Sequence, residues 1–302
     1  MRNFTRRILL ESPNVRGILL AVANGFLLAV ASAIGKQVTQ ELSPFEVAFI
    51  RSTFMLMAML PWLFRVGLRH LKTRYPGLQI IRSGVSAVAI LLWFWALQTV
   101  PLADIAALEF LSPLWVLAGA ILFLGEKSRL WRWAALGVGF AGTMVILRPG
   151  FAEVSIGALA VVASTFCFAA NRLISKFLVH TESPTTVIAW RTALLIVFMI
   201  GPALWVWEWP SLAAWGWLVL LGVLGAVSQF TTIWAIKLAD FGAIEPVSFL
   251  RLVWAALLGL AIFSEIPSVF TLLGGAIVIG SVIYVARRER LEAGPEQVPS
   301  GG

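Results

Sequence analysis

Residues 93–126 read WFWALQTVPLADIAALEFLSPLWVLAGAILFLGE, which is typical of a helix end, a tight corner at Pro101 and a second apolar helix. The same pattern returns 139 residues later, where residues 232–265 read TIWAIKLADFGAIEPVSFLRLVWAALLGLAIFSE. At this offset the matched pairs are Trp95 and Trp234, Ala96 and Ala235, Phe110 and Phe249, Trp115 and Trp254, and Glu126 and Glu265.

The match continues on both sides of this stretch. Upstream, at an offset of 140, Ser43-Pro44 and Arg51 match Ser183-Pro184 and Arg191. Downstream, at an offset of 138, Gly137 and Gly142 match Gly275 and Gly280. Because a drift of one residue is an ordinary loop deletion, we predict an internal duplication of about half the chain.

The composition is that of a membrane protein. Hydrophobic residues make up 60% of the 302 residues, charged residues make up 13%, and the mean hydropathy is +0.90. A soluble domain is about a quarter charged, whereas here the apolar residues form blocks of about 20, the length of a bilayer span. We expect an all-α membrane protein of ten transmembrane helices, at 17–35, 45–64, 79–98, 102–124, 130–147, 156–175, 185–207, 212–236, 241–263 and 268–286.

The basic residues predict the orientation. Of the 23 Lys and Arg, 18 lie between spans on one side, and the other side holds only Lys36 and Arg148. By the positive-inside rule, both termini should be cytoplasmic in a bacterial-type inner membrane. Since each half holds five spans, the second half must insert upside down, as an inverted-topology repeat. The expected units are residues 1–150, residues 151–290 and a disordered cytoplasmic tail at 291–302.

Several other functional classes lack support in the sequence. The net charge of +8 is explained by orientation, so no nucleic-acid partner is expected. The chain has no P-loop, no HExxH and no cluster of Cys and His, so we expect no catalytic residues, no metal and no other cofactor. The GxGxxG match at 137–142 lies inside a span, where small residues favour helix packing over dinucleotide binding. A lipid-embedded monomer with a small-molecule substrate is the expected form.

Charged and polar residues inside spans are the candidate substrate-binding residues, because they are costly there and usually face a cavity or a partner. Glu109, Ser112 and Trp115 share one face of the fourth span, and the equivalent face of the ninth span carries Ser248, Arg251 and Trp254. The repeat therefore places an acid on one face and a base on the other. We expect Glu109 and Arg251 to lie close enough to interact, either as a substrate site or as an ion pair that fixes helix packing.

Further candidates flank these faces. Trp95 and Trp234 occupy matching positions near the corners, where they could be cavity walls or interfacial anchors. Asn24 in the first span and Ser164 and Asn171 in the sixth add polar groups at depth. Arg51 and Arg191 lie at equivalent places, which favours a structural role, such as snorkelling or pairing with a loop carboxylate, over contact with the substrate.

These features resemble the drug/metabolite transporter (DMT) superfamily, EamA type. The likeness rests on the duplicated five-span unit, on Arg51 and Arg191, and on the Leu-Gly-Glu that closes the fourth span at Glu126. The second repeat departs from that close, with Phe-Ser-Glu ending at Glu265. The resemblance implies an inner-membrane carrier of small metabolites working by alternating access. The small multidrug branch uses a glutamate in its first span for proton coupling, where this chain has Asn24.

Within the superfamily, the size and the tryptophan-rich third and fourth spans are most similar to YddG-like amino-acid exporters. We therefore expect export of amino acids, aromatic or other apolar ones included, with Arg251 on the carboxylate, Glu109 on the ammonium and the tryptophans on the apolar part. The alternatives in the same class are import of a vitamin or nucleotide-like cofactor, and drug efflux. A passive channel or a membrane enzyme is the alternative from a different class.

Overall fold

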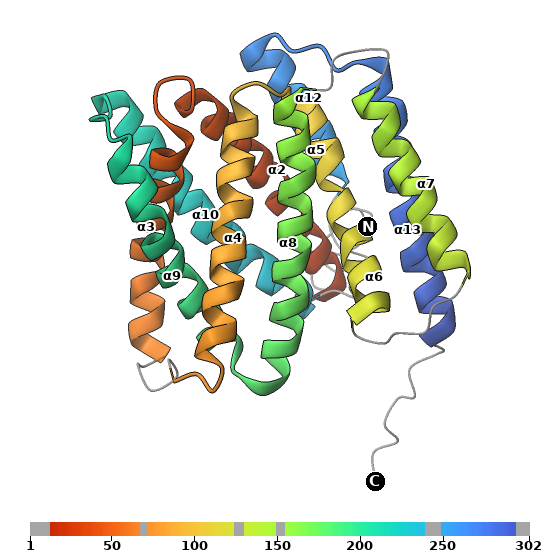
Figure 1. The fold of residues 1–302 in the computed structure, drawn as a ribbon, viewed down its shortest axis with the longest axis horizontal. Coiled ribbons are helices and arrows are strands. Elements are labelled where there is room, and N and C mark those ends of the chain that lie inside the picture. The colour runs from red at the N-terminus through yellow and green to blue at the C-terminus, as the bar shows by residue number, and fades with distance from the viewer. Residues whose placement is uncertain (1–12, 67–71, 124–129, 149–154, 239–248, 294–302) are drawn as a thin grey trace, which may run out of the picture.

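The computed structural model describes residues 13–66, 72–123, 130–148, 155–238 and 249–293, and every regular element in these ranges is an α-helix (Figure 1). Eight helical stretches are long and apolar enough to cross a membrane, and two apolar helices, Leu250–Phe263 and Val269–Val285, are shorter. The predicted all-α membrane class is therefore confirmed, and these ten stretches agree with the ten predicted spans. Most of the predicted disordered tail lies outside the described residues, but α13 includes its first three residues.

The helices have these bounds, in chain order: α2 (Pro13–Val38), α3 (Pro44–Val66), α4 (Pro76–Leu97), α5 (Leu102–Glu109), α6 (Leu111–Phe123), α7 (Leu130–Leu147), α8 (Ile156–Thr181), α9 (Pro184–Trp205), α10 (Leu212–Leu238), α12 (Leu250–Phe263) and α13 (Val269–Ala293). Proline stands at the first position of α2, α3, α4 and α9, where its missing N–H costs nothing.

Several helices differ from the predicted spans at their ends, and two of the differences matter for the candidate site and the orientation. The fourth span is not continuous, because α5 ends at Glu109 and α6 begins at Leu111. The third begins earlier than predicted, at Pro76, so Arg82 belongs to α4 and is 2% exposed, although the orientation argument counts it as a loop charge. Moving Arg82 into a helix removes one basic residue from the side that holds 18. The other side still holds only Lys36 and Arg148, so the bias in basic residues remains.

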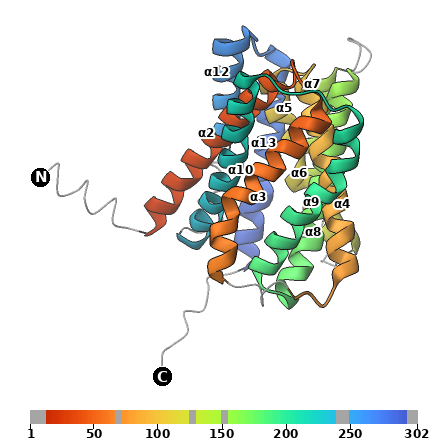
Figure 2. The same cartoon turned by 90° about the vertical axis from the view of Figure 1, so that its left-hand side faces the viewer.

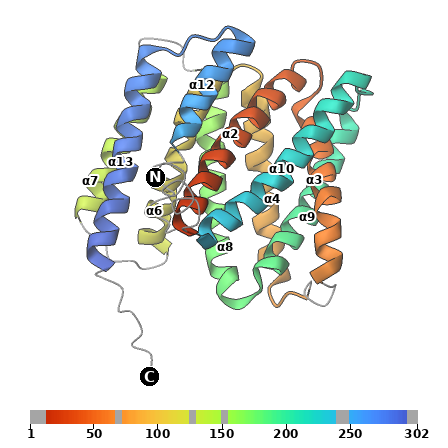
Figure 3. The same cartoon turned by 180° about the vertical axis from the view of Figure 1, so that it is seen from behind.

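The helices form two main layers. Viewed from the α3–α9 edge, α2, α10 and α12 lie on one side and α4, α6 and α8 on the other (Figure 2). Within the first layer α2 packs against both α10 and α12, and within the second α8 packs against both α4 and α6. At one edge α7 pairs with α13, and at the opposite edge α3 pairs with α9 (Figures 1 and 3).

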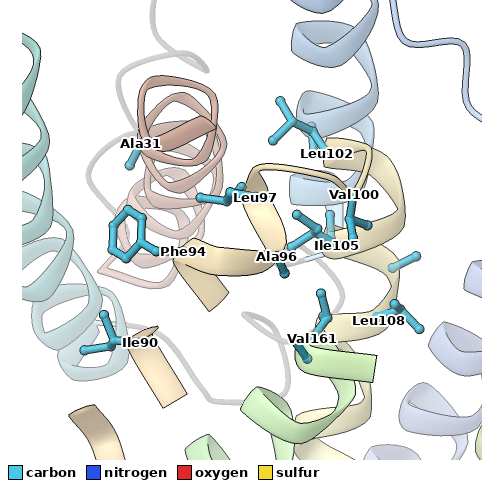
Figure 4. Packing of buried hydrophobic residues seen from close by; sticks show 14 of the residues in the cluster. Ala31, Ile90, Phe94, Ala96, Leu97, Val100, Leu102, Ile105, Leu108 and Val161 are labelled. Carbon is cyan, nitrogen blue, oxygen red and sulfur yellow. The ribbon is translucent and has the colours of Figure 1, made fainter. Parts of the chain in front are cut away.

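The buried core surrounds the corner between α4 and α5. Phe94, Leu97 and Leu102 are at most 1% exposed, and Ala31 of α2 and Val161 of α8 pack around the same corner (Figure 4). Because lipid tails are as apolar as these side chains, close packing rather than removal from water holds such helices together. The corner thus fixes α5, and with it Glu109, against both layers.

Glycines allow α7 and α13 to approach closely. A Cβ added to Gly142 would lie 2.9 Å from the carbonyl oxygen of Gly274, which is closer than side chains tolerate. Gly142 is the last glycine of the GxGxxG match, so the helix-packing interpretation of that residue is confirmed. Gly137, the first, has nothing near its Cβ position.

Glu182 ties the ends of several helices together at the loop between α8 and α9. Its carboxylate accepts hydrogen bonds from the Thr73 hydroxyl, the Arg74 and Tyr75 backbone N–H groups and Gln79 Nε2, the last at 2.8 Å. Partial burial raises the pKa of Glu182, but these four hydrogen bonds outweigh it and hold the pKa below its ordinary value of 4.5. The carboxylate therefore links the segment before α4 to the end of α8.

We expect Glu182→Gln to destabilise the protein at pH 7 by about 1–2 kcal/mol, since hydrogen bonds to a charged group are lost. A lowered pKa in the folded state means that this contribution is complete above pH 4.5 and lost as the pH falls through the lower folded value. Thermal unfolding in detergent at pH 7 and pH 4 measures it, with the exposed Glu41→Gln as the control. A deficit that is the same size at both pH values would contradict the role of the charge.

Candidate functional site

The break between α5 and α6 follows Glu109, which is eight residues into the fourth span. Pro113 has no N–H to donate to the Glu109 carbonyl four residues earlier, which weakens the helix at this point. Phe110 stays near helical geometry, with φ −68° and ψ −6°, and the chain resumes as α6. Discontinuous helices at mid-membrane are typical of transporter binding sites.

Arg251 meets Glu109 across the two layers. Arg251 Nη1 lies 2.8 Å from Glu109 Oε2, and the two side chains keep 20% and 16% of their surface exposed. The predicted pairing is therefore present. Arg251 is the second residue of α12, where the positive end of the helix dipole disfavours a cation. Arg251 therefore does not stabilise the start of α12. Its ion pair with Glu109 offsets the cost of placing a charge there.

Three predicted site residues carry a buried polar atom that makes no hydrogen bond. These atoms are Ser112 Oγ, Asn171 Oδ1 and Trp254 Nε1. An unsatisfied buried polar group costs about 1–3 kcal/mol, so such groups are uncommon without a reason. A bound substrate with donors and acceptors would satisfy them.

Residues of α2 lie against Arg251 and Trp254 of α12. A Cβ at Gly25 would lie 3.8 Å from the Arg251 Cβ, and the Phe26 and Trp254 rings meet edge to face at 5.3 Å. Beside them, Asn24 accepts a hydrogen bond from Ser228 at 2.7 Å and donates one to Thr232 at 3.0 Å, so it joins α2 to α10. Asn24 is thus next to the ion pair but already hydrogen-bonded.

The remaining predicted site residues lie apart from this group. Trp115 Nε1 donates to Thr165 at 3.2 Å, and its ring packs on Phe140 and Phe166. Ser164 is fully buried and donates to the Val161 carbonyl of its own helix.

The two repeat-matched tryptophans near the corners are exposed. Trp95 is 42% exposed and Trp234 is 54% exposed. Ser248 lies outside the described residues.

A second ion pair was not predicted. Lys36 of α2 pairs with Glu265, which follows α12, and Lys36 Nζ also donates to the Val100 carbonyl at 2.8 Å. The other Glu265 oxygen accepts the Leu102 N–H at 2.9 Å. The sequence analysis counted Lys36 among the basic residues between spans, and Glu265 entered it only as the repeat match of Glu126. Lys36 is buried, with 7% of its surface exposed, but this burial depends on the fold and has no signal in the sequence.

The chain matches the description "EamA-like transporter family" twice, at residues 15–148 and 155–287. The "Riboflavin transporter" of Rhizobium johnstonii is 31% identical over 294 residues, which is 96% of this chain and 97% of the relative. The "S-adenosylmethionine uptake transporter" of Rickettsia bellii is 29% identical over 88% of this chain and 93% of the relative.

Two further comparisons are more distant. The "Pseudopaline exporter CntI" of Pseudomonas aeruginosa is 25% identical over 91% of this chain and 97% of the relative. A solved crystal structure matches 93% of this chain and 98% of its own chain, with a TM-score of 0.62 and 20% identity. At that identity the structural match speaks for the fold alone.

Proposed function

Because the chain belongs to the EamA-like transporter family of the DMT superfamily, we propose that it is a secondary carrier of a vitamin- or cofactor-sized metabolite, working by alternating access. The observation that carries this proposal is the Glu109–Arg251 ion pair at the helix break, among buried polar atoms without partners. A passive channel or an enzyme has no comparable support from these residues.

An inverted repeat is the architecture that we propose for this carrier, with units 1–150 and 151–290. It is supported by the two separate family matches and by equivalent helix pairs, since α2–α12 corresponds to α8–α6. The aromatic contacts also correspond, because Phe26 meets Trp254 at 5.3 Å and Phe166 meets Trp115 at 5.4 Å. An inverted repeat offers two similar closures, one at each face, which is what alternating access requires.

We further propose an inner-membrane location with cytoplasmic termini, and this orientation is testable. In a Cys167→Ser background, a cysteine at Lys72 should be shielded from an impermeant thiol reagent in intact cells, whereas one at Glu41 should be labelled. The reason is the excess of Lys and Arg on the Lys72 side. Permeabilised cells, in which both cysteines react, provide the control. Labelling at position 72 in intact cells would overturn the orientation.

The proposed substrate class follows from the site together with the named relatives. Riboflavin and S-adenosylmethionine both carry a flat heteroaromatic ring with several polar groups. Phe26 and Trp254 offer edge and face contacts to such a ring, and the unpaired Ser112 Oγ and Trp254 Nε1 offer hydrogen bonds. The relatives' names favour the vitamin or cofactor alternative over the expected amino-acid export.

Export of amino acids remains the second candidate. The observation that favours it is that the ion pair joins one base and one acid, which a zwitterion could replace with its own carboxylate and ammonium. An amino-acid group on a larger molecule, such as that of S-adenosylmethionine, would use the same two contacts.

Binding to the purified protein separates the two candidates. Equilibrium dialysis with labelled riboflavin, S-adenosylmethionine, phenylalanine and leucine should show saturable binding of at least one of the two cofactor-sized compounds. Unlabelled compound in excess should displace the label, whereas a neutral sugar should not. Saturable binding of an amino acid, with none of either larger compound, would instead establish the second candidate.

A further inference from the structure

Three arginines inside the spans form a second charged group, away from Glu109. Arg82 of α4 donates to the Val187 carbonyl of α9 at 2.5 Å and to the Ser175 hydroxyl at 3.0 Å. Arg191 of α9 donates from Nε to the Ser86 hydroxyl of α4 at 3.1 Å. The two contacts are therefore reciprocal, and each arginine lies four residues along its helix from the other's partner, which is about one turn.

Arg51 of α3 lies beside α4 at Phe94, about two turns along α4 from Ser86. Its guanidinium carbon lies 5.8 Å from the centre of the Phe94 ring of α4. A Cβ added to Gly225 of α10 would lie 3.2 Å from Arg51 Nη2, so the guanidinium also reaches α10. Repulsion from Arg191 acts on both Arg51 and Arg82, so Arg191 is within electrostatic reach of each of them.

Arg51 has fewer hydrogen-bond partners than Arg191, its counterpart in the second repeat. Arg191 bonds Ser86, but the residue that matches Ser86 in the second repeat is Gly225, which offers Arg51 no hydroxyl. Within the described ranges, the structure gives Arg51 no hydrogen bond and no carboxylate at ion-pair distance. A loop carboxylate, one of the structural partners considered for Arg51 and Arg191, is therefore not seen with Arg51 among the described residues.

No described acid neutralises this group. Among the described buried acids, Glu109 and Glu265 are paired with Arg251 and Lys36. Asp104 accepts a hydrogen bond from Thr271, and Glu46 accepts the Glu208 N–H at 3.5 Å. Glu182 is the acid whose field reaches Arg82, but its carboxylate is occupied by four hydrogen bonds at the loop. Arg82 is 2% exposed, and its Nε makes no hydrogen bond. An unneutralised charge at this depth is expensive, and a bound anion is the direct way to offset it.

We propose that Arg51, Arg82 and Arg191 form a binding site for an anionic group, a carboxylate or a phosphate, carried by the transported molecule. Arg51 and Arg191 keep part of their surface accessible and would contact the anion, while the fully buried Arg82 adds its field. Guanidinium groups suit this task because they bind carboxylate and phosphate oxygens in pairs. This inference rests on the proposed carrier function and makes its substrate an organic anion or zwitterion.

Two matched probe pairs test the charge of the ligand. Flavin mononucleotide differs from riboflavin by one phosphate, and leucine differs from leucinamide by one carboxylate. We expect the purified wild-type protein to bind the anionic member of at least one pair at least about tenfold more tightly, as judged by equilibrium dialysis. Arg191→Gln and Arg51→Gln should remove that preference, and Arg65→Gln, an exposed arginine of α3, should keep it.

Inorganic phosphate tests the site independently of the substrate. It should raise the melting temperature of the wild type in a saturable manner, and the Arg51→Gln/Arg191→Gln protein should lose this shift while Arg65→Gln keeps it. Should the glutamine variants not fold, Arg51→Lys and Arg191→Lys retain the charge and should weaken the shift without abolishing it.

The outcomes separate this site from the proposed function. A phosphate shift that depends on Arg51 and Arg191 supports the anion site even if no flavin or amino acid binds. Saturable binding of neutral riboflavin, with no preference in either pair and no arginine-dependent phosphate shift, would overturn the anion site and leave the carrier function standing. A phosphate shift of equal size in the wild type and the double variant would also overturn it.

Discussion

Replacing Glu109 or Arg251 singly with glutamine is expected to destabilise the protein more than replacing both. Each single change leaves the partner as an uncompensated charge inside the span, with a cost of about 2 kcal/mol or more. The figure is set at the lower end because Glu109 and Arg251 keep 16% and 20% of their side-chain surface exposed. The double variant removes both charges and should recover most of the folded yield.

A double-mutant cycle that reads both melting temperature and transport decides what the pair is for. Recovered yield without transport would support a site in which the substrate meets both charges. Recovered yield with normal transport would show that the pair only fixes helix packing. Additive losses would mean that the 2.8 Å contact between Arg251 Nη1 and Glu109 Oε2 does not stabilise the protein. Glu41→Gln, at an exposed acid, is the matched control.

Replacing Lys36 with methionine is expected to cost still more, about 3–5 kcal/mol, because Glu265 then lacks its partner. Lys36 is 7% exposed, so water cannot replace its contacts with Glu265 and with the Val100 carbonyl. Glu265 in turn accepts the Leu102 N–H at the first residue of α5. The change should therefore loosen the corner that positions Glu109.

Thermal unfolding in detergent measures this effect, with the exposed Lys72→Met as the control. Lys36→Met combined with Glu265→Gln should regain most of the lost melting temperature, since no buried charge is then left alone. A single variant as stable as the wild type would show that Lys36 and Glu265 are solvated in the protein and do not brace the corner.

The helices and the pairing of the two charges could be predicted from the sequence for definite reasons. Apolar blocks of about 20 residues leave helices as the one option in a bilayer. The duplication then supplied a comparison within one chain. It showed that Glu109 and Arg251 break the match between the repeats, and the structure places them 2.8 Å apart.

The rest of the candidate site depends on contacts between distant parts of the chain. Lys36 and Glu265 are separated by 229 residues, and neither stands in a local pattern that points to the other. Arg82 looked like a loop charge because it lies six residues after Pro76, close to the basic segment that precedes α4. Trp95 and Trp234 match in the repeat, but a match does not say which face of a helix is buried, and both are exposed.

Counterflow in proteoliposomes tests the central claim most directly. Vesicles containing the purified protein are preloaded with unlabelled S-adenosylmethionine or riboflavin and diluted into a trace of the same compound with a label. A carrier with one alternating site predicts transient accumulation of label above equilibrium, in preloaded vesicles alone, and its loss in Arg251→Gln. Entry of label at a rate that neither preloading nor excess substrate changes would contradict a carrier and establish a pore.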